Sequence, residues 1–205
     1  DVPTLGKSFR DGGYQTAYIG KWHLYASGEQ GDREFGPVPE SHRAGYDYWL
    51  ASNVLEFTSE AYSTTMYDNE NNPVHLPGYR VDAQTDAAIR YIDAHHESGP
   101  LFLFLSFLEP HHQNRLDDYP APDGYRERYQ GQWIPPDLAE LRGSAHQHLG
   151  GYYGMVKRLD EALGRLQDTL KSLGISDNTI LMQTTDHGCH FKTRNSEYKR
   201  SGHES

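Results

Sequence analysis

The feature that most constrains the fold is an alternation of amphipathic helices with short apolar strands. Residues 101–107 read Leu-Phe-Leu-Phe-Leu-Ser-Phe, a run of strand length that is apolar on both faces and therefore suits the centre of a parallel sheet. Residues 81–95 before this run and residues 144–173 after it carry apolar side chains at helical spacing,. Helices that alternate with buried strands predict an α/β fold with a largely parallel sheet.

Three further segments extend this pattern. Residues 4–12 predict a short helix that ends at Gly12-Gly13,. Residues 14–19 alternate and carry aromatic and β-branched side chains, and residues 179–184 follow the long helix, so we expect a strand at each place,. The chain shows no internal repeat and no internal domain boundary.

The two remaining stretches are rich in turn formers. We expect a long loop over residues 25–79 that contains two short strands, at 46–50 and 54–58,. A second loop, rich in Tyr, Pro and Arg, is expected over residues 117–136. Long loops between regular elements are typical of enzymes, in which loops carry binding and catalytic groups.

The composition excludes several classes of protein. The 205 residues have a formal net charge of −10, which is a poor match for the phosphate backbone of a nucleic acid or for an anionic membrane surface. A local cluster of Lys and His side chains can still bind a small anion inside an acidic protein. One cysteine, Cys189, excludes an internal disulfide, and no apolar run is long enough to predict a transmembrane segment,.

Polar clusters follow three of the expected strands. They are Lys21 with His23, His111 with His112, and Asp186 with His187. In open α/β sheets, ligands bind outside the carboxyl ends of the strands. We therefore expect three separate segments to deliver Lys, His and Asp to one edge of one sheet.

The residue types indicate the chemistry. Lys is a compact positive donor suited to phosphate or sulfate oxygens, and His can bind an oxyanion or transfer a proton near neutral pH. Asp186 with a neighbouring ligand can hold a hard divalent cation. Together these groups predict transfer or hydrolysis of an oxyanion ester, with positive charge placed where negative charge develops.

Each cluster also has a purely structural interpretation. Lys21 can be a surface lysine, His23 can pack beside Trp22, and the Asp-His-Gly at 186–188 can be an ordinary turn,. Either His111 or His112 can be the functional histidine, and a turn that ends the strand is an equally good interpretation of this segment. We expect Cys189 to be a small packing residue. The remaining basic and imidazole side chains are expected on solvated loops, on the surface or in packing, with anion binding as a competitor for the basic ones: Lys192, Arg194, Lys199, Arg200, His42, His75, His95, His96, His146 and His148.

Residues 13–24 read Gly-Tyr-Gln-Thr-Ala-Tyr-Ile-Gly-Lys-Trp-His-Leu. This segment closely resembles the second signature of the type I, formylglycine-dependent sulfatases, a family of the alkaline phosphatase superfamily. Residues 104–111 resemble the family's strand that ends in Pro-His, and residues 153–188 resemble its long helix, turn and metal-binding strand end. Lys199 stands five residues before Glu204, like the Lys-x-x-x-x-Glu that follows in the family.

The resemblance implies a fold and a reaction. The fold would be an α/β sandwich in which helices flank a central, mostly parallel mixed sheet that is incomplete in this chain. The reaction would be hydrolysis of a sulfate ester, with Ca²⁺ (or Mg²⁺) bound partly by Asp186 and His187. Lys21 and Lys199 would hold sulfate oxygens. His23 would take a proton from the formylglycine hydrate, and His111 would bind sulfate and assist the leaving oxygen.

The family's nucleophile motif, Cys/Ser-x-Pro/Ala-x-Arg, and its paired acidic metal ligands do not occur in this sequence. In the family both precede the Gly-Lys-Trp-His motif. The resemblance thus implies that residues 1–205 are part of a sulfatase catalytic domain, inactive alone, whose nucleophile segment and C-terminal subdomain lie outside them.

Several functional alternatives stay open at this point. Within the superfamily, the ester can instead be that of a phosphodiesterase or phosphonate monoester hydrolase, and a non-catalytic relative can bind sulfated glycans without cleaving them. The resemblance favours a sulfated small molecule or glycan as the partner, with a carbohydrate first. It also implies a periplasmic, secreted or lysosomal location.

Overall fold

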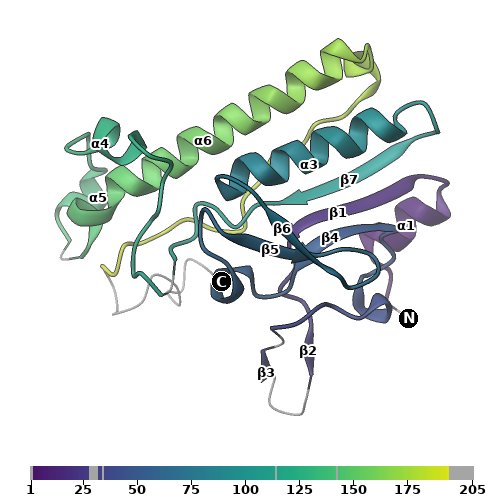
Figure 1. Ribbon diagram of the computed structural model, residues 1–205. Helices are drawn as coiled ribbons and strands as arrows, with labels where there is room; N and C mark the ends of the chain where they lie inside the picture. The colour runs from purple at the N-terminus through teal and green to yellow at the C-terminus, as the bar shows by residue number, and fades with distance from the viewer. Residues whose placement is uncertain (1, 28–31, 34, 114, 142, 194–205) are drawn as a thin grey trace. The chain divides into compact units, whose positions relative to one another are not determined.

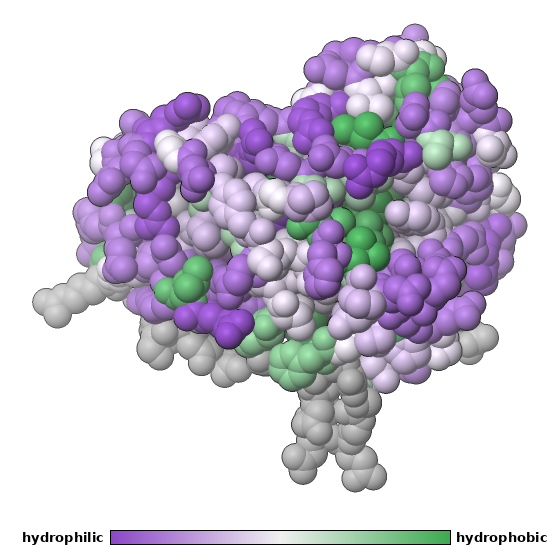
Figure 2. Space-filling view, viewed as in Figure 1, coloured by the Kyte–Doolittle hydropathy of each residue, from purple (hydrophilic) through white to green (hydrophobic). Residues whose placement is uncertain are grey.

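The computed structural model describes residues 2–27, 32–33, 35–113, 115–141 and 143–193. The chain forms two compact units, Asp1–Leu108 and Glu109–Ser205. The structure determines the arrangement inside each unit (Figure 1). Hydrophilic residues cover most of the face drawn in Figure 2, in keeping with a mean hydropathy of −0.82.

The first unit is built on a five-stranded mixed sheet with the strand order β6-β5-β4-β1-β7. β1 pairs in parallel with both β4 and β7, whereas β5 pairs antiparallel with β4 and β6. Successive parallel strands thus place their carboxyl ends at one edge. The strands are β1 (Gln15–Lys21), β4 (Tyr48–Ser52), β5 (Thr64–Tyr67), β6 (Pro73–Leu76) and β7 (Leu101–Ser106).

Helices α1 (Leu5–Asp11) and α3 (Arg80–His95) pack on opposite faces of this sheet. Phe9 of α1 stacks on Phe102, with ring centroids 3.9 Å apart, and Phe102 is in register with Thr16. Tyr91 of α3 contacts Tyr48, which is in register with Ala17. Because successive side chains of a strand point to opposite faces, the two helices cover the two sides of β1.

Short elements complete the first unit. They are β2 (Ala26–Ser27), β3 (Asp32–Arg33), the 3-10 turn η1 (Glu40–His42) and the one-turn helix α2 (Leu55–Thr58). β2 and β3 form a separate antiparallel pair. α2 follows directly after β4, so its side chains lie near the carboxyl ends of the parallel strands.

The second unit is built on one long helix. α6 (Ala145–Ser172) carries the apolar stripe, and α4 (Tyr125–Tyr129), α5 (Pro136–Ala139) and the 3-10 turn η2 (Ser176–Asn178) accompany it. Gly151 lets the chain at Tyr119 lie directly against α6, since a Cβ at Gly151 would lie 2.4 Å from the carbonyl oxygen of Tyr119. The loop after His112 is therefore held against the start of α6.

The structure confirms most of the predicted elements. Helices at 4–12, 81–95 and 144–173, and strands at 14–19 and 101–107, are present within two residues of their predicted ends. The strand predicted at 46–50 begins and ends two residues later, as β4. The fold is α/β, as predicted, and the sheet is mixed.

Three expectations about the strands were wrong. Residues 55–58 of the strand predicted at 54–58 instead form the helix α2, because the buried carboxylate of Glu56 pairs with Lys21 in the helical conformation. Residues 179–184 form no strand in the described structure, and the side chain of Ile180 is 90% exposed. In the described structure this segment pairs with no strand, and a strand without a partner has no ladder of hydrogen bonds to stabilise it,. β7 is an edge strand of the described sheet rather than a central one, and Phe104 is 39% exposed.

Candidate active site

The Gly-Lys-Trp-His segment lies where β1 ends, and its glycine is required by close packing. Gly20 has a φ of +124°, a conformation that side chains other than glycine rarely adopt,. A Cβ on Gly20 would lie 1.9 Å from the carbonyl oxygen of Ser106 on β7. Glycine thus allows β7 to approach the residue just before Lys21.

Backbone hydrogen bonds carry the strand pairing beyond β1. The N–H of Trp22 donates to the carbonyl of Ser52 over 2.9 Å, and the N–H of His23 donates to the carbonyl of Asn53 over 2.8 Å. The Asn53 side chain also bonds both backbone groups of Tyr25, as acceptor at 3.2 Å and as donor at 2.7 Å. Lys21 and His23 therefore stand on a backbone that the end of β4 holds in place.

An aromatic cluster fixes the other side of this segment. The Trp22 ring is buried and packs edge-on against Tyr18 and against Trp49, with centroid distances of 4.9 Å and 5.1 Å. The Tyr18 hydroxyl donates to the carbonyl oxygen of Lys21, and burial raises the pKa of Tyr18 above its ordinary value. With Trp22 anchored in the core, the side chains on either side of it, Lys21 and His23, point elsewhere.

Both of these side chains meet the carboxylate of Glu56 from α2. Lys21 Nζ lies 3.0 Å from Glu56 Oε1, and His23 Nδ1 lies 3.6 Å from the same oxygen. The Glu56 side chain is only 3% exposed, whereas the His23 side chain is 44% exposed. Lys21 and Glu56 thus form a charge-assisted hydrogen bond. His23 and Glu56 are too far apart for a hydrogen bond but lie within ion-pair distance.

The electrostatic balance keeps Glu56 ionised. Burial alone acts to raise the pKa of this carboxyl, but the charge of Lys21, a backbone N–H, the Lys21 hydrogen bond and the charge of His23 outweigh it and lower the pKa,. His23 itself has a φ of +54°. Strained conformations of non-glycine residues cluster at functional sites, and here the strain places an imidazole beside a buried carboxylate.

In the second unit, His111 and His112 stack on each other with ring centroids 5.2 Å apart. His111 Nδ1 lies 2.5 Å from the carbonyl oxygen of His112, so this nitrogen carries the proton and donates to the carbonyl,. In the neutral ring, Nε2 of His111 then has the lone pair. The His112 ring lies 6.1 Å from that of Tyr119 and belongs to the aromatic packing of the loop.

Asp186 and His187 also face each other. His187 Nε2 lies 3.4 Å from Asp186 Oδ2, and His187 Nδ1 lies 2.7 Å from the carbonyl oxygen of Gly188. The carbonyl holds the proton on Nδ1, which leaves Nε2 as a ligand atom next to a carboxylate oxygen.

This pair fits part of a cation site. Adjacent ligands of one cation, each about 2.1 to 2.4 Å from it, are separated by about 3 to 3.4 Å. The carboxylate of Asp186 is 82% exposed, so it can accept a cation. Among residues 2–27, 32–33, 35–113, 115–141 and 143–193, no group of three or more His, Cys, Asp or Glu side chains comes together. Asp186 and His187 thus supply only part of a ligand shell.

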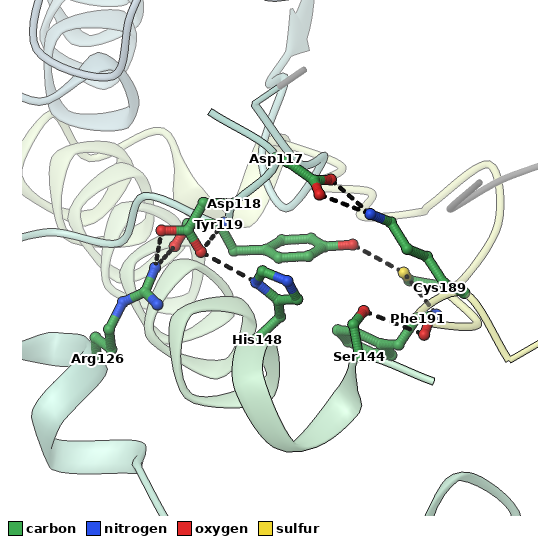
Figure 3. Close-up of polar contacts among 9 residues, drawn as sticks. Asp117, Asp118, Tyr119, Arg126, Ser144, His148, Cys189 and Phe191 are labelled. Carbon is green, nitrogen blue, oxygen red and sulfur yellow. Dashed lines mark hydrogen bonds and ion pairs between the residues drawn. The ribbon is translucent and has the colours of Figure 1, made fainter. Parts of the chain in front are cut away.

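Polar contacts that sequence reasoning missed hold the loop that follows His112 and the segment that follows His187 (Figure 3). Asp118 accepts from Arg126 Nη2 over 2.5 Å and lies 3.1 Å from Nδ1 of the buried His148. Burial acts to raise the pKa of Asp118, but bonds from Arg126, the Tyr119 N–H and His148 outweigh it and lower the pKa. His148 was expected on the surface or in packing, and it is a buried packing residue.

The same network reaches the residues just after Asp186 and His187. The Tyr119 hydroxyl lies 2.9 Å from Cys189 Sγ, and Ser144 donates to the carbonyl of Phe191 through both its N–H, at 2.7 Å, and its hydroxyl, at 3.1 Å. Lys192 Nζ reaches both carboxylate oxygens of Asp117, at 2.8 Å and 2.7 Å. Cys189 is thus a packing residue, as predicted, and Lys192 takes part in an ion pair.

The structure brings the predicted site residues together in groups. Lys21 and His23 meet on Glu56 in the first unit, while His111 and the Asp186–His187 pair belong to the second. Lys199 lies outside the described residues. Convergence of all of them at one sheet edge stays a prediction.

The family profile and the relatives that match this chain are all described as sulfatases. The sequence profile of the family described as Sulfatase matches residues 1–205. An ulvan-active sulfatase of Formosa agariphila is 31% identical over 189 residues, which cover 90% of this chain and 35% of that protein. An N-acetylglucosamine-6-O-sulfatase of Bacteroides thetaiotaomicron is 23% identical, over 92% of this chain and 44% of that protein.

Solved structures agree on the fold. A putative sulfatase yidJ of Bacteroides fragilis matches 95% of this chain and 45% of its own with a TM-score of 0.75 at 22% identity. The chain thus spans about a third to a half of the length of these relatives.

Proposed function

This chain belongs to the sulfatase family, and from that premise we propose that the protein containing it hydrolyses a sulfate ester of a carbohydrate. The observation that carries the proposal is the pairing of Lys21 and His23 on one buried carboxylate at the carboxyl end of β1. A fixed ammonium suits a sulfate oxygen, and a half-exposed imidazole suits proton transfer.

Each residue has a role that follows from its own chemistry. Lys21, together with Lys199, holds sulfate oxygens and neutralises charge that develops on them. His23 accepts a proton. His111 binds sulfate and, as an imidazolium, gives a proton from Nε2 to the leaving oxygen, while the bond from its Nδ1 to the His112 carbonyl orients the ring,.

Asp186 and His187 would hold part of a Ca²⁺ site, with Mg²⁺ as the alternative ion. When bound, a divalent cation polarises sulfate oxygens as a Lewis acid. We further propose that the nucleophile is a formylglycine that lies outside residues 1–205. This chain would then be one part of a catalytic domain, and it would be inactive alone.

The relatives support a carbohydrate as the substrate class, because one of them is named as an N-acetylglucosamine-6-O-sulfatase. We also propose a periplasmic, secreted or lysosomal location. None of the helices in the described part of the chain combines the length and the apolar character that crossing a membrane requires.

The test uses the complete, purified enzyme and measures sulfate released from a sulfated monosaccharide, an aryl sulfate and, for comparison, phosphate released from a phosphodiester of matched leaving group. The proposal predicts release of sulfate from the sugar and a much slower reaction with the phosphodiester. Preference for the phosphodiester would assign the protein to that class of hydrolase instead. Binding of the sulfated sugar without any release would identify a non-catalytic glycan-binding protein.

A further inference from the structure

Glu56 is a buried carboxylate of the first unit that the proposed reaction does not use. It comes from α2, a one-turn helix whose N–H at Phe57 bonds back to the carbonyl of Val54 over 2.9 Å. Leu55 beside it is fully buried and anchors the turn in the core. The helix therefore presents the Glu56 carboxylate at a fixed position below the end of β1.

We propose that Glu56 is a positioning residue for the sulfatase reaction, which holds Lys21 and His23 in place and fixes the proton of His23 on Nδ1. This inference rests on the proposed function. Glu56 Oε1 lies 3.0 Å from Lys21 Nζ and 3.6 Å from His23 Nδ1, so one oxygen faces both groups.

The tautomer of His23 follows from simple electrostatics. A carboxylate beside Nδ1 favours the form in which Nδ1 carries the proton, and Nε2 then has the lone pair. The His23 side chain is 44% exposed and Nδ1 faces Glu56, so a proton taken up by this tautomer goes to Nε2. The arrangement resembles the way an acidic residue orients the histidine of a serine hydrolase triad.

The position of Lys21 depends on the same oxygen. A lysine side chain has several rotatable bonds, and holding its ammonium at a fixed point costs conformational entropy. The hydrogen bond to Glu56, whose side chain is 3% exposed, already holds the Lys21 side chain in one conformation before substrate binds. Substrate binding then costs less conformational entropy. An ammonium carries three donors, and the bond to Glu56 uses one of them,.

The charged groups that face one another here come from three segments: Lys21 from β1, His23 from the turn after it, and Glu56 from α2. Removing the negative charge of Glu56 leaves the positive charge of Lys21 near His23. The His23 imidazolium then becomes less stable, so the pKa of His23 should fall.

The experiment compares the complete wild-type enzyme with Glu56→Gln and with Glu97→Gln as a matched control, since the Glu97 side chain is 90% exposed. For each protein, kcat and KM for an aryl sulfate are measured over a range of pH, and kcat/KM is plotted against pH. We expect Glu56→Gln to lower kcat by about 10- to 100-fold with a smaller change in KM, and to move the acidic limb to lower pH by about one pH unit. Glu97→Gln should match wild type.

Two results would overturn the proposal: a wild-type rate in Glu56→Gln, or a lower rate with an unmoved acidic limb, which is the signature of a merely structural role. If Glu56→Gln does not fold, Glu56→Asp keeps the charge but moves it away by one methylene group. Its acidic limb should then shift part of the way to lower pH, and an unchanged limb would again contradict the proposal.

The failure of the proposed function can be told apart from the failure of this inference. The pKa of His23 can be followed by NMR in the complete wild-type and Glu56→Gln enzymes without any substrate. A lower pKa in the variant supports the coupling even if the wild-type enzyme releases no sulfate, and equal pKa values refute it even if the wild-type enzyme is active.

Discussion

The ammonium of Lys21 lies 3.0 Å from the carboxylate of Glu56, and both side chains are largely buried, at 14% and 3% exposed. Two segments 35 residues apart in the sequence thus meet in a single ion pair. Removing one member leaves an uncompensated buried charge. We expect Glu56→Ala to lower the free energy of unfolding by about 3 to 5 kcal/mol, measured by chemical denaturation of the complete enzyme.

The same carboxylate predicts how stability responds to acid. The pKa of Glu56 in the folded protein is lower than its ordinary value of 4.5, so its ionisation stabilises the fold at pH values above that ordinary pKa. This contribution is lost as the pH falls below 4.5 and through the lowered folded-state pKa,. The thermal midpoint of wild type should drop over this window, and that of Glu56→Gln should drop less. Parallel curves for the two proteins would show that Glu56 does not carry the effect.

Gly20 should tolerate no side chain. Gly20→Ala combines a φ of +124° with a Cβ 1.9 Å from the Ser106 oxygen, so β7 must move away from β1. We expect a loss of at least about 3 kcal/mol of stability. Gly36→Ala is the control, because a Cβ at Gly36 meets nothing within 4 Å. Equal stability of the two variants would contradict the close approach of β1 and β7.

Asp118 should stabilise the second unit through Arg126 and His148. Asp118→Asn weakens two charge-assisted bonds, so we expect a cost of about 1 to 3 kcal/mol. Asp168→Asn on α6 is the matched control, since the Asp168 side chain is 79% exposed and exposed pairs contribute less than about 1 kcal/mol. A smaller loss for Asp118→Asn than for Asp168→Asn would show that the network is not stabilising.

Chelation should remove activity from the complete enzyme, and Ca²⁺ should restore it. In Asp186→Ala, the Ca²⁺ affinity measured by calorimetry should fall at least about tenfold. Asp177→Ala, at an exposed position of η2, should bind Ca²⁺ like wild type. Unchanged affinity in Asp186→Ala would exclude this residue as a ligand.

The end of β1 could be predicted because its constraints are local. Glycine is needed at position 20, Trp22 is a large apolar anchor, and the two polar residues alternate with it, so the pattern itself indicates a strand end with two presented side chains. The spacing of apolar residues likewise predicted α3 and α6, whose buried faces follow a helical period.

Glu56 could not be predicted, because nothing in the residues around it indicates a buried carboxylate. Residues 54–58 have the aromatic and β-branched composition of a strand. The one-turn helix forms instead because Leu55 is buried in the core and Glu56 forms an ion pair with Lys21. Such partners are distant in sequence. Asp118 and His148 were missed for the same reason, since they are 30 residues apart.

The hairpin of β5 and β6 was overlooked although a local signal existed. Asp68 caps the turn through its side chain, and its Oδ1 accepts from the N–H groups of Glu70 and Asn72 at 3.0 Å and 2.8 Å. Asp and Asn side chains favour such turns. The opposite error occurred at 179–184, where we predicted a strand after the long helix and the described structure forms none.

The central claim is that Lys21 binds the sulfate group of the substrate. The most direct test is the rate of sulfate release by the complete enzyme carrying Lys21→Ala, with Lys157→Ala of α6 as a surface lysine control. The account predicts a loss of about 10²- to 10³-fold in kcat/KM for Lys21→Ala, and no loss for the control, in proteins shown to be folded by circular dichroism. Near-normal sulfate release by folded Lys21→Ala would contradict it.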